Sequence, residues 1–254
     1  MNPNFNFRQG ATTSKADLPP MSERSRFWTG WVAESSAWED NPDNRRRAEV
    51  VLAAIDGFVR PHDRVLDVGC GTGWMTRQLG RRSDRVTGQD LASDAMDALR
   101  RTHPQVTWIG GDFVTVALNE PAYEAIVCME TISHVPDQKA FAARIVQLLA
   151  PGGKLILTTQ NPYVWHRTSW LEPTKAGQLR NWPTRDRLRE LFGQGLTIQS
   201  IETCAPGGDL GIPRLAHNPV TRRLAERALG IDRWFRVREA LELGRSIVLV
   251  GRRA

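Results

Sequence analysis

The segment VLDVGCGTG, which runs from Val65 to Gly73, constrains the fold more than any other part of the sequence. A β-rich apolar run enters a turn that contains Gly69, Gly71 and Gly73, and a helix-compatible stretch begins at Trp74. Glycines let the backbone approach a ligand closely, and the N–H groups at the start of the helix point at that ligand. Many dinucleotide-binding proteins share this pattern, so the turn alone predicts only a nucleotide-like ligand.

Trp74 and two downstream acids narrow the identity of that ligand. Trp74 stands where a dinucleotide-binding turn has its third glycine, and an indole would obstruct the close helix–strand packing, which argues against NAD or FAD. Asp90 ends the next predicted strand and could accept hydrogen bonds from both hydroxyls of a ribose. Asp112 ends the third strand and could accept one from an adenine amino group. Both acids are expected beside the glycine turn, because ligands of open α/β sheets bind at the carboxyl ends of the strands.

The pattern of the chain predicts alternating strands and helices. The predicted strands are 64–69, 85–90, 106–112, 123–130, 154–160, 196–203 and 246–253. The predicted helices are 45–59, 74–82, 93–103, with Ser93 as N-cap, 137–150 and 184–193. Repeated β-α-β units require right-handed crossovers, so the sequence predicts a doubly wound, mostly parallel α/β sheet with helices on both faces.

The length of 254 residues suits one large domain, which we expect at 21–254 after a polar, flexible lead-in at 1–20. Two segments lie outside the alternation: 21–60, expected as an N-terminal helical cap, and 205–244, expected as a helical insertion before the last strand. Both are candidates for lid elements over a pocket. The chain shows no secretory apolar region and no membrane-length apolar stretch, and its three cysteines are scattered, which favours a cytoplasmic protein.

Several segments resemble the class I S-adenosylmethionine-dependent methyltransferases, in particular the small-molecule branch that includes ubiquinone-biosynthesis O-methyltransferases. The resemblance covers residues 45–162 well and the last two strands loosely. It implies a Rossmann-like sheet of seven strands, of which the last is antiparallel. The matching segments are VLDVGCGTG, VTGQD, GGD, YEAIVCMETISHV and LLAPGGKLILTTQNP.

The resemblance implies that S-adenosylmethionine is the cofactor. It assigns the methionine part to the glycine loop, the ribose to Asp90, and the adenine to Asp112 and the Phe113 backbone. The residues expected at the cofactor are Asp67, Gly69, Cys70, Gly71, Gly73, Asp90, Leu91, Asp112, Phe113 and Met129.

A histidine follows the fourth predicted strand, whose end faces the methyl group in this family. The related O-methyltransferases carry a Glu-then-His arrangement here, which Glu130 and His134 match as candidate catalytic residues. His134 titrates near neutrality, so it could be a general base, or it could be a structural or positioning residue. His166 is a second candidate. The five histidines show no metal-ligand spacing, so no metal is predicted.

Seven of the nine tryptophans lie outside the regular alternation, in the N-terminal segment, in the connector 161–183 and in the late insertion. If these segments meet at the sheet edge, they form an aromatic-walled pocket for the methyl acceptor. The alternative is local packing of helices onto the sheet. The residues expected at the acceptor are Trp31, Trp38, His166 and Trp170.

These observations favour O-methylation of a small or lipid-like acceptor. N-methylation of a small amine, methylation of nucleic acid and a scaffold without activity remain alternatives. Of the net charge of +6, the range 205–254 carries +5, from ten Arg and five acids. This C-terminal part could meet nucleic acid, an anionic membrane or an acidic substrate, or could form a solvated surface. No RNA-binding module is visible, and the fourth strand lacks the Asn/Asp-Pro-Pro-aromatic motif typical of many enzymes that methylate amino groups of nucleic acids.

Overall fold

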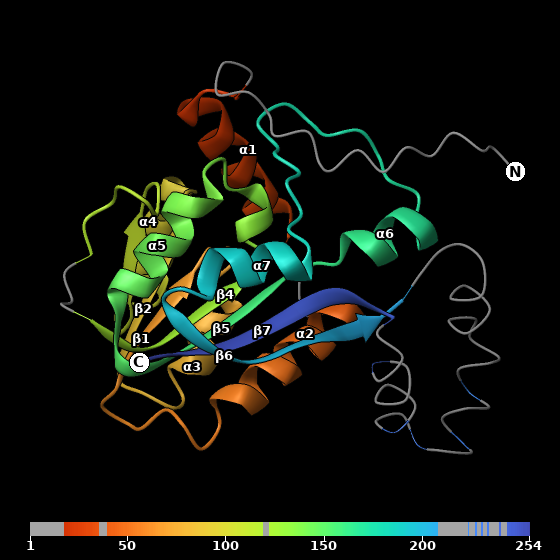
Figure 1. Cartoon of the computed structure of the whole chain (residues 1–254). Coiled ribbons are helices and arrows are strands. Elements are labelled where there is room, and N and C mark those ends of the chain that lie inside the picture. The colour runs from red at the N-terminus through yellow and green to blue at the C-terminus, as the bar shows by residue number, and fades with distance from the viewer. Residues whose placement is uncertain are drawn as a thin grey trace, which may run out of the picture.

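The computed structural model describes residues 18–35, 40–118, 122–207 and 243–254, with residues 223, 227, 230, 233 and 239. The described strands form one seven-stranded sheet in the order β3-β2-β1-β4-β5-β7-β6 (Figure 1). β7 runs antiparallel to both of its neighbours, β5 and β6. The first five strands pair with one another in parallel, as predicted. The strands are β1 (Arg64–Val68), β2 (Arg85–Asp90), β3 (Thr107–Gly110), β4 (Tyr123–Met129), β5 (Leu149–Gln160), β6 (Leu196–Pro206) and β7 (Gly244–Arg253).

The helices agree with the expected positions except at three places. The first predicted helix begins earlier, at Pro42, because the Asn41 side chain caps it by accepting from the Asp43 N–H. Ser93 is not an N-cap: Ala92 has that position, and its N–H donates to Asp90. The connector 161–183 contains a short helix of its own. The helices are α1 (Met21–Glu34), α2 (Pro42–Ile55), α3 (Trp74–Leu79), α4 (Ser93–Thr102), the 3₁₀ turn η3 (Ile132–His134), α5 (Gln138–Leu148), α6 (Pro162–Thr168) and α7 (Arg185–Phe192).

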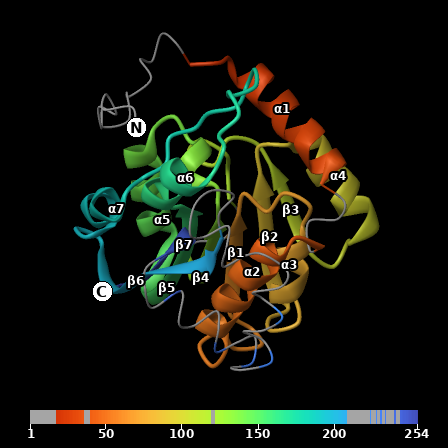
Figure 2. The ribbon, with the colours of Figure 1, turned by 90° about the vertical axis from the view of Figure 1, so that its right-hand side faces the viewer.

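Helices cover both faces of the sheet, and the strands are therefore apolar on both sides (Figures 1 and 2). Leu66 and Val68 of β1 lie in a buried cluster with side chains of α5 and α7. Val65, on the opposite face of the same strand, lies in a second cluster with side chains of α2 and α3. This alternation follows from the two-residue period of a strand and fixes the orientation of β1 in the sheet.

The order of the strands reverses next to β1, which pairs with β2 on one side and with β4 on the other. The loops that leave β1 and β4 therefore diverge, and such a switch point is where ligands bind in open α/β sheets. α1 and the connector after α6 lie side by side near the loops that follow these strands (Figure 2). The Ser25 hydroxyl of α1 donates to the Leu91 carbonyl over 3.1 Å, and a Cβ on Gly177 of the connector would lie 2.7 Å from the Glu23 carbonyl oxygen.

Some sequence predictions concern residues outside the described ranges. These are most of the lead-in at 1–20, Trp38, and nearly all of the helical insertion at 205–244. The expected cap at 21–60 contains α1 and α2. None of the helices within the described ranges is long and apolar enough to span a bilayer.

Candidate functional site

The glycine turn after β1 adopts a backbone conformation that requires glycine. Gly69 has φ 72°, in the left-handed region, and a Cβ there would lie 2.6 Å from Cγ2 of Thr131. Gly73 has φ 71°, and a Cβ there would lie 2.6 Å from the Trp108 indole. A Cβ on Gly71, which has φ 52°, would lie 3.6 Å from the Trp31 indole, an ordinary contact distance. The first glycine thus packs the turn against the loop after β4, and the third packs it against β3.

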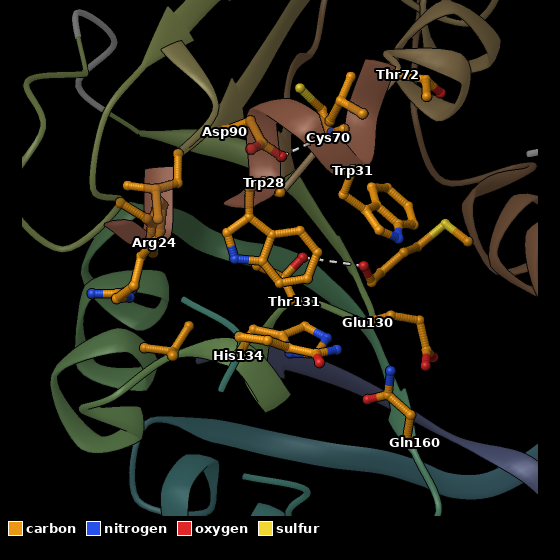
Figure 3. A pocket seen from close by; sticks show the side chains of 18 of the residues that line it. Arg24, Trp28, Trp31, Cys70, Thr72, Asp90, Glu130, Thr131, His134 and Gln160 are labelled. Carbon is orange, nitrogen blue, oxygen red and sulfur yellow. Dashed lines mark hydrogen bonds between the residues drawn. The ribbon is translucent and has the colours of Figure 1, made fainter. Parts of the chain in front are cut away.

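Asp90, at the end of β2, holds the glycine turn in place. One carboxylate oxygen accepts from the Gly71 N–H and the other from the Ala92 N–H, each over 2.9 Å (Figure 3). Burial raises the pKa of Asp90, and these backbone donors lower it. A carboxylate offers about four acceptor positions, and the backbone donors of Gly71, Leu91 and Ala92 act on this one, so at least one position remains for a ligand hydroxyl.

Asp67 lies beneath the same turn and is almost completely buried. It accepts a hydrogen bond from the Thr76 hydroxyl over 2.6 Å. Burial raises the pKa of Asp67 to about 7, although the bond from Thr76 lowers it. Asp67 therefore joins β1 to α3 through a carboxyl group that is only partly ionised at neutral pH.

A cavity of about 490 Å³ opens above this turn. Gly73, which was also predicted at the cofactor, does not line it: its neighbours Trp108 and Leu99 place it behind the turn. We name the part lined by the other predicted cofactor residues the glycine-loop half: Asp67, Gly69, Cys70, Gly71, Asp90, Leu91, Asp112, Phe113 and Met129.

Arg24 of α1 also lines the cavity, and sequence reasoning missed it. It is 7% exposed, and its Nε has no hydrogen-bond partner. Burial lowers the pKa of Arg24, and the charge of Asp112 opposes that shift. The sequence of α1 is mostly polar around Arg24, so it could not have predicted that this arginine is buried.

His134 lies in η3, directly after β4, and points into the cavity (Figure 3). Its Nδ1 is 2.6 Å from the Leu179 carbonyl oxygen, which can only accept, so Nδ1 carries the proton and Nε2 carries the lone pair. The Trp28 ring lies 4.6 Å from the imidazole. Burial first, and then the charge of Arg180, lower the pKa of His134 to about 4. The imidazole is therefore neutral at neutral pH.

Glu130 follows β4 and Gln160 ends the neighbouring strand β5, and both lie near His134 (Figure 3). Glu130 has φ 58°, which is unfavourable for a residue with a side chain and is typical of functional sites. Its carboxylate lies 3.1 Å from Nε of the buried Arg47, which also donates to Ser246. The Gln160 Oε1 is buried and has no hydrogen-bond partner among the described residues. Sequence reasoning missed Arg47 and Gln160, although the position of Gln160 at a strand end could have indicated it.

Tryptophans from two distant segments meet at the same cavity. Trp28 and Trp31 come from α1, and the others come from α6 and the connector after it. We name the following group the tryptophan half: Trp28, Glu130, His134, Gln160, Trp165, Trp170, Arg180 and Trp182.

Two of the predicted acceptor residues, Trp31 and Trp170, line this cavity, and Trp38 lies outside the described ranges. His166 does not line it: it is exposed on α6, with its ring 5.6 Å from that of Trp182. Figure 3 shows Trp28 and Trp31 lying across the opening between the glycine turn and the His134 loop. The structure therefore brings together two of the three expected aromatic segments and gives His166 no place at the acceptor.

The cavity fits S-adenosylmethionine in its chemistry. The turn at Gly71 leaves room for close approach, and Asp90 keeps at least one acceptor position for a ribose hydroxyl. Asp112 uses one oxygen for the Val114 N–H over 2.8 Å and lines the cavity next to Phe113.

Comparison with known proteins agrees with this chemistry. A family model described as a methyltransferase domain matches residues 22–200. The ubiquinone biosynthesis O-methyltransferase of Idiomarina loihiensis is 28% identical over 222 residues, which cover 82% of this chain and 90% of the relative. The enzyme of the same description from Cronobacter sakazakii is 31% identical and covers 66% of this chain and 71% of its own length.

Solved structures show the same fold. The N-methyltransferase NodS of Bradyrhizobium japonicum, in complex with S-adenosyl-L-homocysteine, matches with a TM-score of 0.63 at 18% identity and covers 91% of this chain and 98% of its own. An S-adenosylmethionine-dependent methyltransferase of Mesorhizobium loti matches with a TM-score of 0.59 at 20% identity, over 81% and 98% of the two chains. With its seven-stranded sheet, its glycine turn and a family match over most of its length, the chain belongs to the methyltransferase-domain family and is an S-adenosylmethionine-dependent methyltransferase.

Proposed function

We propose that the protein methylates a hydroxyl group of a small-molecule acceptor. The observation that carries this proposal is the environment of His134, whose Nδ1 proton is held by the Leu179 carbonyl while Nε2 remains an acceptor inside the cavity. A hydroxyl must lose its proton when it is methylated, and a neutral imidazole nitrogen can take that proton. The similarity to ubiquinone biosynthesis O-methyltransferases supports the same reading.

The glycine-loop half would hold the cofactor. Asp90 would accept from the ribose hydroxyls, Asp112 and the Phe113 backbone would meet the adenine, and the glycine turn would lie along the methionine part. When bound, S-adenosylmethionine supplies a methyl group on a sulfonium, an electrophile whose leaving sulfur keeps the bonding electron pair. The chain itself must hold the acceptor oxygen in line with that methyl group, which contributes up to roughly 7–11 kcal/mol to catalysis.

His134 would accept the hydrogen bond of the acceptor hydroxyl at Nε2 and take its proton as the new C–O bond forms. A base with a pKa of about 4 is weaker than an ordinary imidazole, so its proton affinity alone contributes little. Its fixed tautomer and its contact with Trp28 contribute by holding the oxygen in one orientation. His134 would therefore act as a positioning residue and as the proton acceptor in the same step.

Glu130 and Gln160 would bind further polar groups of the acceptor. The Gln160 oxygen is buried without a partner, which is unfavourable until a ligand donates to it. Glu130 lies 3.1 Å from Arg47, and its buried Oε1 has no hydrogen-bond donor among the described residues, so it could accept a hydrogen bond from a second hydroxyl. Such a set of acceptors fits a molecule that presents two neighbouring hydroxyls.

A direct test incubates the protein with S-adenosylmethionine and a panel of catechols, monophenols and arylamines, and measures S-adenosylhomocysteine. We expect product with catechols and little with arylamines. Methylation of the arylamines alone would replace this proposal with N-methylation.

A further inference from the structure

Arg180 is a cation of the tryptophan half that no described acid neutralises. It lines the cavity from the connector, and its guanidinium carbon lies 5.4 Å from the ring centre of Trp182. Within the described ranges, no carboxylate forms an ion pair with Arg180 and no group accepts a hydrogen bond from it. Glu172, an acid of the same connector, lines the cavity without pairing with it. A guanidinium has five N–H donors, so Arg180 has unused binding capacity.

The other arginines of the cavity differ in this respect. Arg47 contacts Glu130 over 3.1 Å, and donates to Ser246 over 2.9 Å and to Asn44 over 2.8 Å. Arg24 is buried, and the charge of Asp112 acts on it. Arg180 is thus the cavity arginine that forms neither a hydrogen bond nor an ion pair with the described residues.

Arg180 lies close to His134, the residue that we expect to receive the acceptor hydroxyl. It follows Leu179, whose carbonyl oxygen holds Nδ1 of His134 at 2.6 Å. Its charge contributes, after burial, to the lowered pKa of both His134 and His166, the titratable neighbours that feel it. The charge therefore acts close to His134.

We propose that Arg180 binds a carboxylate of the acceptor, so that the substrate is a hydroxylated aromatic acid. This proposal rests on the proposed O-methyltransferase function. The planar fork of a guanidinium matches a carboxylate with two parallel hydrogen bonds, which gives both affinity and orientation. The neighbouring indoles, Trp165 and Trp182, have ring centres 5.8 Å apart and supply flat apolar surface for the aromatic ring. Arg180 would fix one end of the acceptor while His134 receives the hydroxyl.

The test compares acids with their primary amides, which have nearly the same shape but no charge. Protocatechuate, salicylate and caffeate, each beside its amide, are titrated into the protein saturated with S-adenosylhomocysteine, and dissociation constants are measured by calorimetry. We expect at least one acid to bind about tenfold more tightly than its amide, the scale of one charge-assisted hydrogen-bonded pair. Arg180→Gln should reduce that preference to about twofold or less, and Arg180→Lys should keep part of it because an ammonium lacks the fork.

Arg167→Gln is the matched control, since it removes the same charge from exposed α6, outside the cavity, and should keep the preference. Retained binding of S-adenosylhomocysteine shows that each variant is folded. If the wild type prefers no acid over its amide, or if Arg180→Gln keeps the preference, the carboxylate proposal is wrong while the methyltransferase function stands. Failure of the wild type to bind S-adenosylhomocysteine would instead overturn the proposed function, and this proposal with it.

Discussion

The glycine-loop half and the tryptophan half of the cavity are built in different ways. The first comes from the ends of β1, β2 and β3, and most of its residues fall between positions 67 and 113. Backbone N–H groups hold its acids, as those of Gly71 and Ala92 hold Asp90. The second comes from α1, the ends of β4 and β5, α6 and the connector, which span positions 28 to 182. It is held by contacts between segments, such as that of His134 with Leu179.

This difference means that the fold constrains the side chains of the cofactor site more strongly than those of the acceptor site. A cofactor site made of turns and strand ends depends on the sheet, which β-strand pairing fixes. An acceptor site made of a helix and a connector can change its side chains without disturbing the sheet. The comparison therefore predicts that substitutions in the glycine-loop half alter folding and cofactor affinity, and that those in the tryptophan half alter turnover.

Gly69→Ala should give the largest effect. The added Cβ would overlap Thr131 and would have to accept φ 72°, so we expect the free energy of unfolding to fall by about 3 kcal/mol. Gly57→Ala is the control, because Gly57 has φ 77° with nothing within 4 Å and carries the backbone cost alone. Denaturant melts of both variants separate the clash from the strain. Equal losses would mean that the turn is not packed against Thr131.

His134→Ala should lower kcat by about 100-fold with little change in cofactor affinity, because the acceptor oxygen loses both the group that orients it and its proton acceptor, while the glycine turn is untouched. Steady-state kinetics and calorimetry with S-adenosylhomocysteine measure the two effects. His166→Ala, an exposed histidine outside the cavity, should leave kcat unchanged. A large loss of cofactor affinity in His134→Ala would contradict the separation of the two halves.

The sequence was sufficient for the glycine-loop half because its residues are set by local spacing. The strands β1, β2 and β3 could be predicted from their apolar patterns, and Gly69, Asp90 and Asp112 lie at or just after their carboxyl ends. Parallel pairing brings these strand ends to one edge of the sheet. The sequence could not show that Gly73 packs behind the turn, because a left-handed glycine can serve either a ligand or a packing contact and only the position of Trp108 distinguishes them.

The tryptophan half could be predicted only as a group of aromatic residues. Nothing local places Trp28 against His134 or buries Arg47 against Ser246, since these contacts join segments about 100 and 200 positions apart. His166 does not line the cavity because α6, which the sequence did not predict, turns it outward, while Trp165, one position earlier, lines the cavity.

Asp90→Ala should weaken S-adenosylhomocysteine binding by about tenfold or more, since the ribose would lose its acceptor and the Gly71 N–H would lose its partner. Asp90→Asn keeps one acceptor oxygen, so its loss should be smaller. Calorimetry measures both, with Asp97→Ala on the exposed side of α4 as the control. An unchanged affinity in Asp90→Ala would remove Asp90 from the cofactor site and weaken the view that strand ends define this half.

Asp67→Asn tests the buried charge under the glycine turn and should give the smallest effect. The pKa of Asp67 is raised in the folded protein to about 7, so between about pH 4 and pH 7 the unfolded chain has already lost the proton that the folded chain retains. The free energy of unfolding therefore falls as pH rises through this window. Removing the carboxyl group should make the difference between about pH 5 and pH 8 smaller by about 1 kcal/mol, because water in the adjoining cavity limits the full cost of burial. Asp186→Asn, whose side chain is 92% exposed, should leave the slope unchanged. Denaturant melts at the two pH values decide, and an unaltered slope in Asp67→Asn would mean that the carboxyl group is ionised in the folded state and that its charge is compensated at the turn.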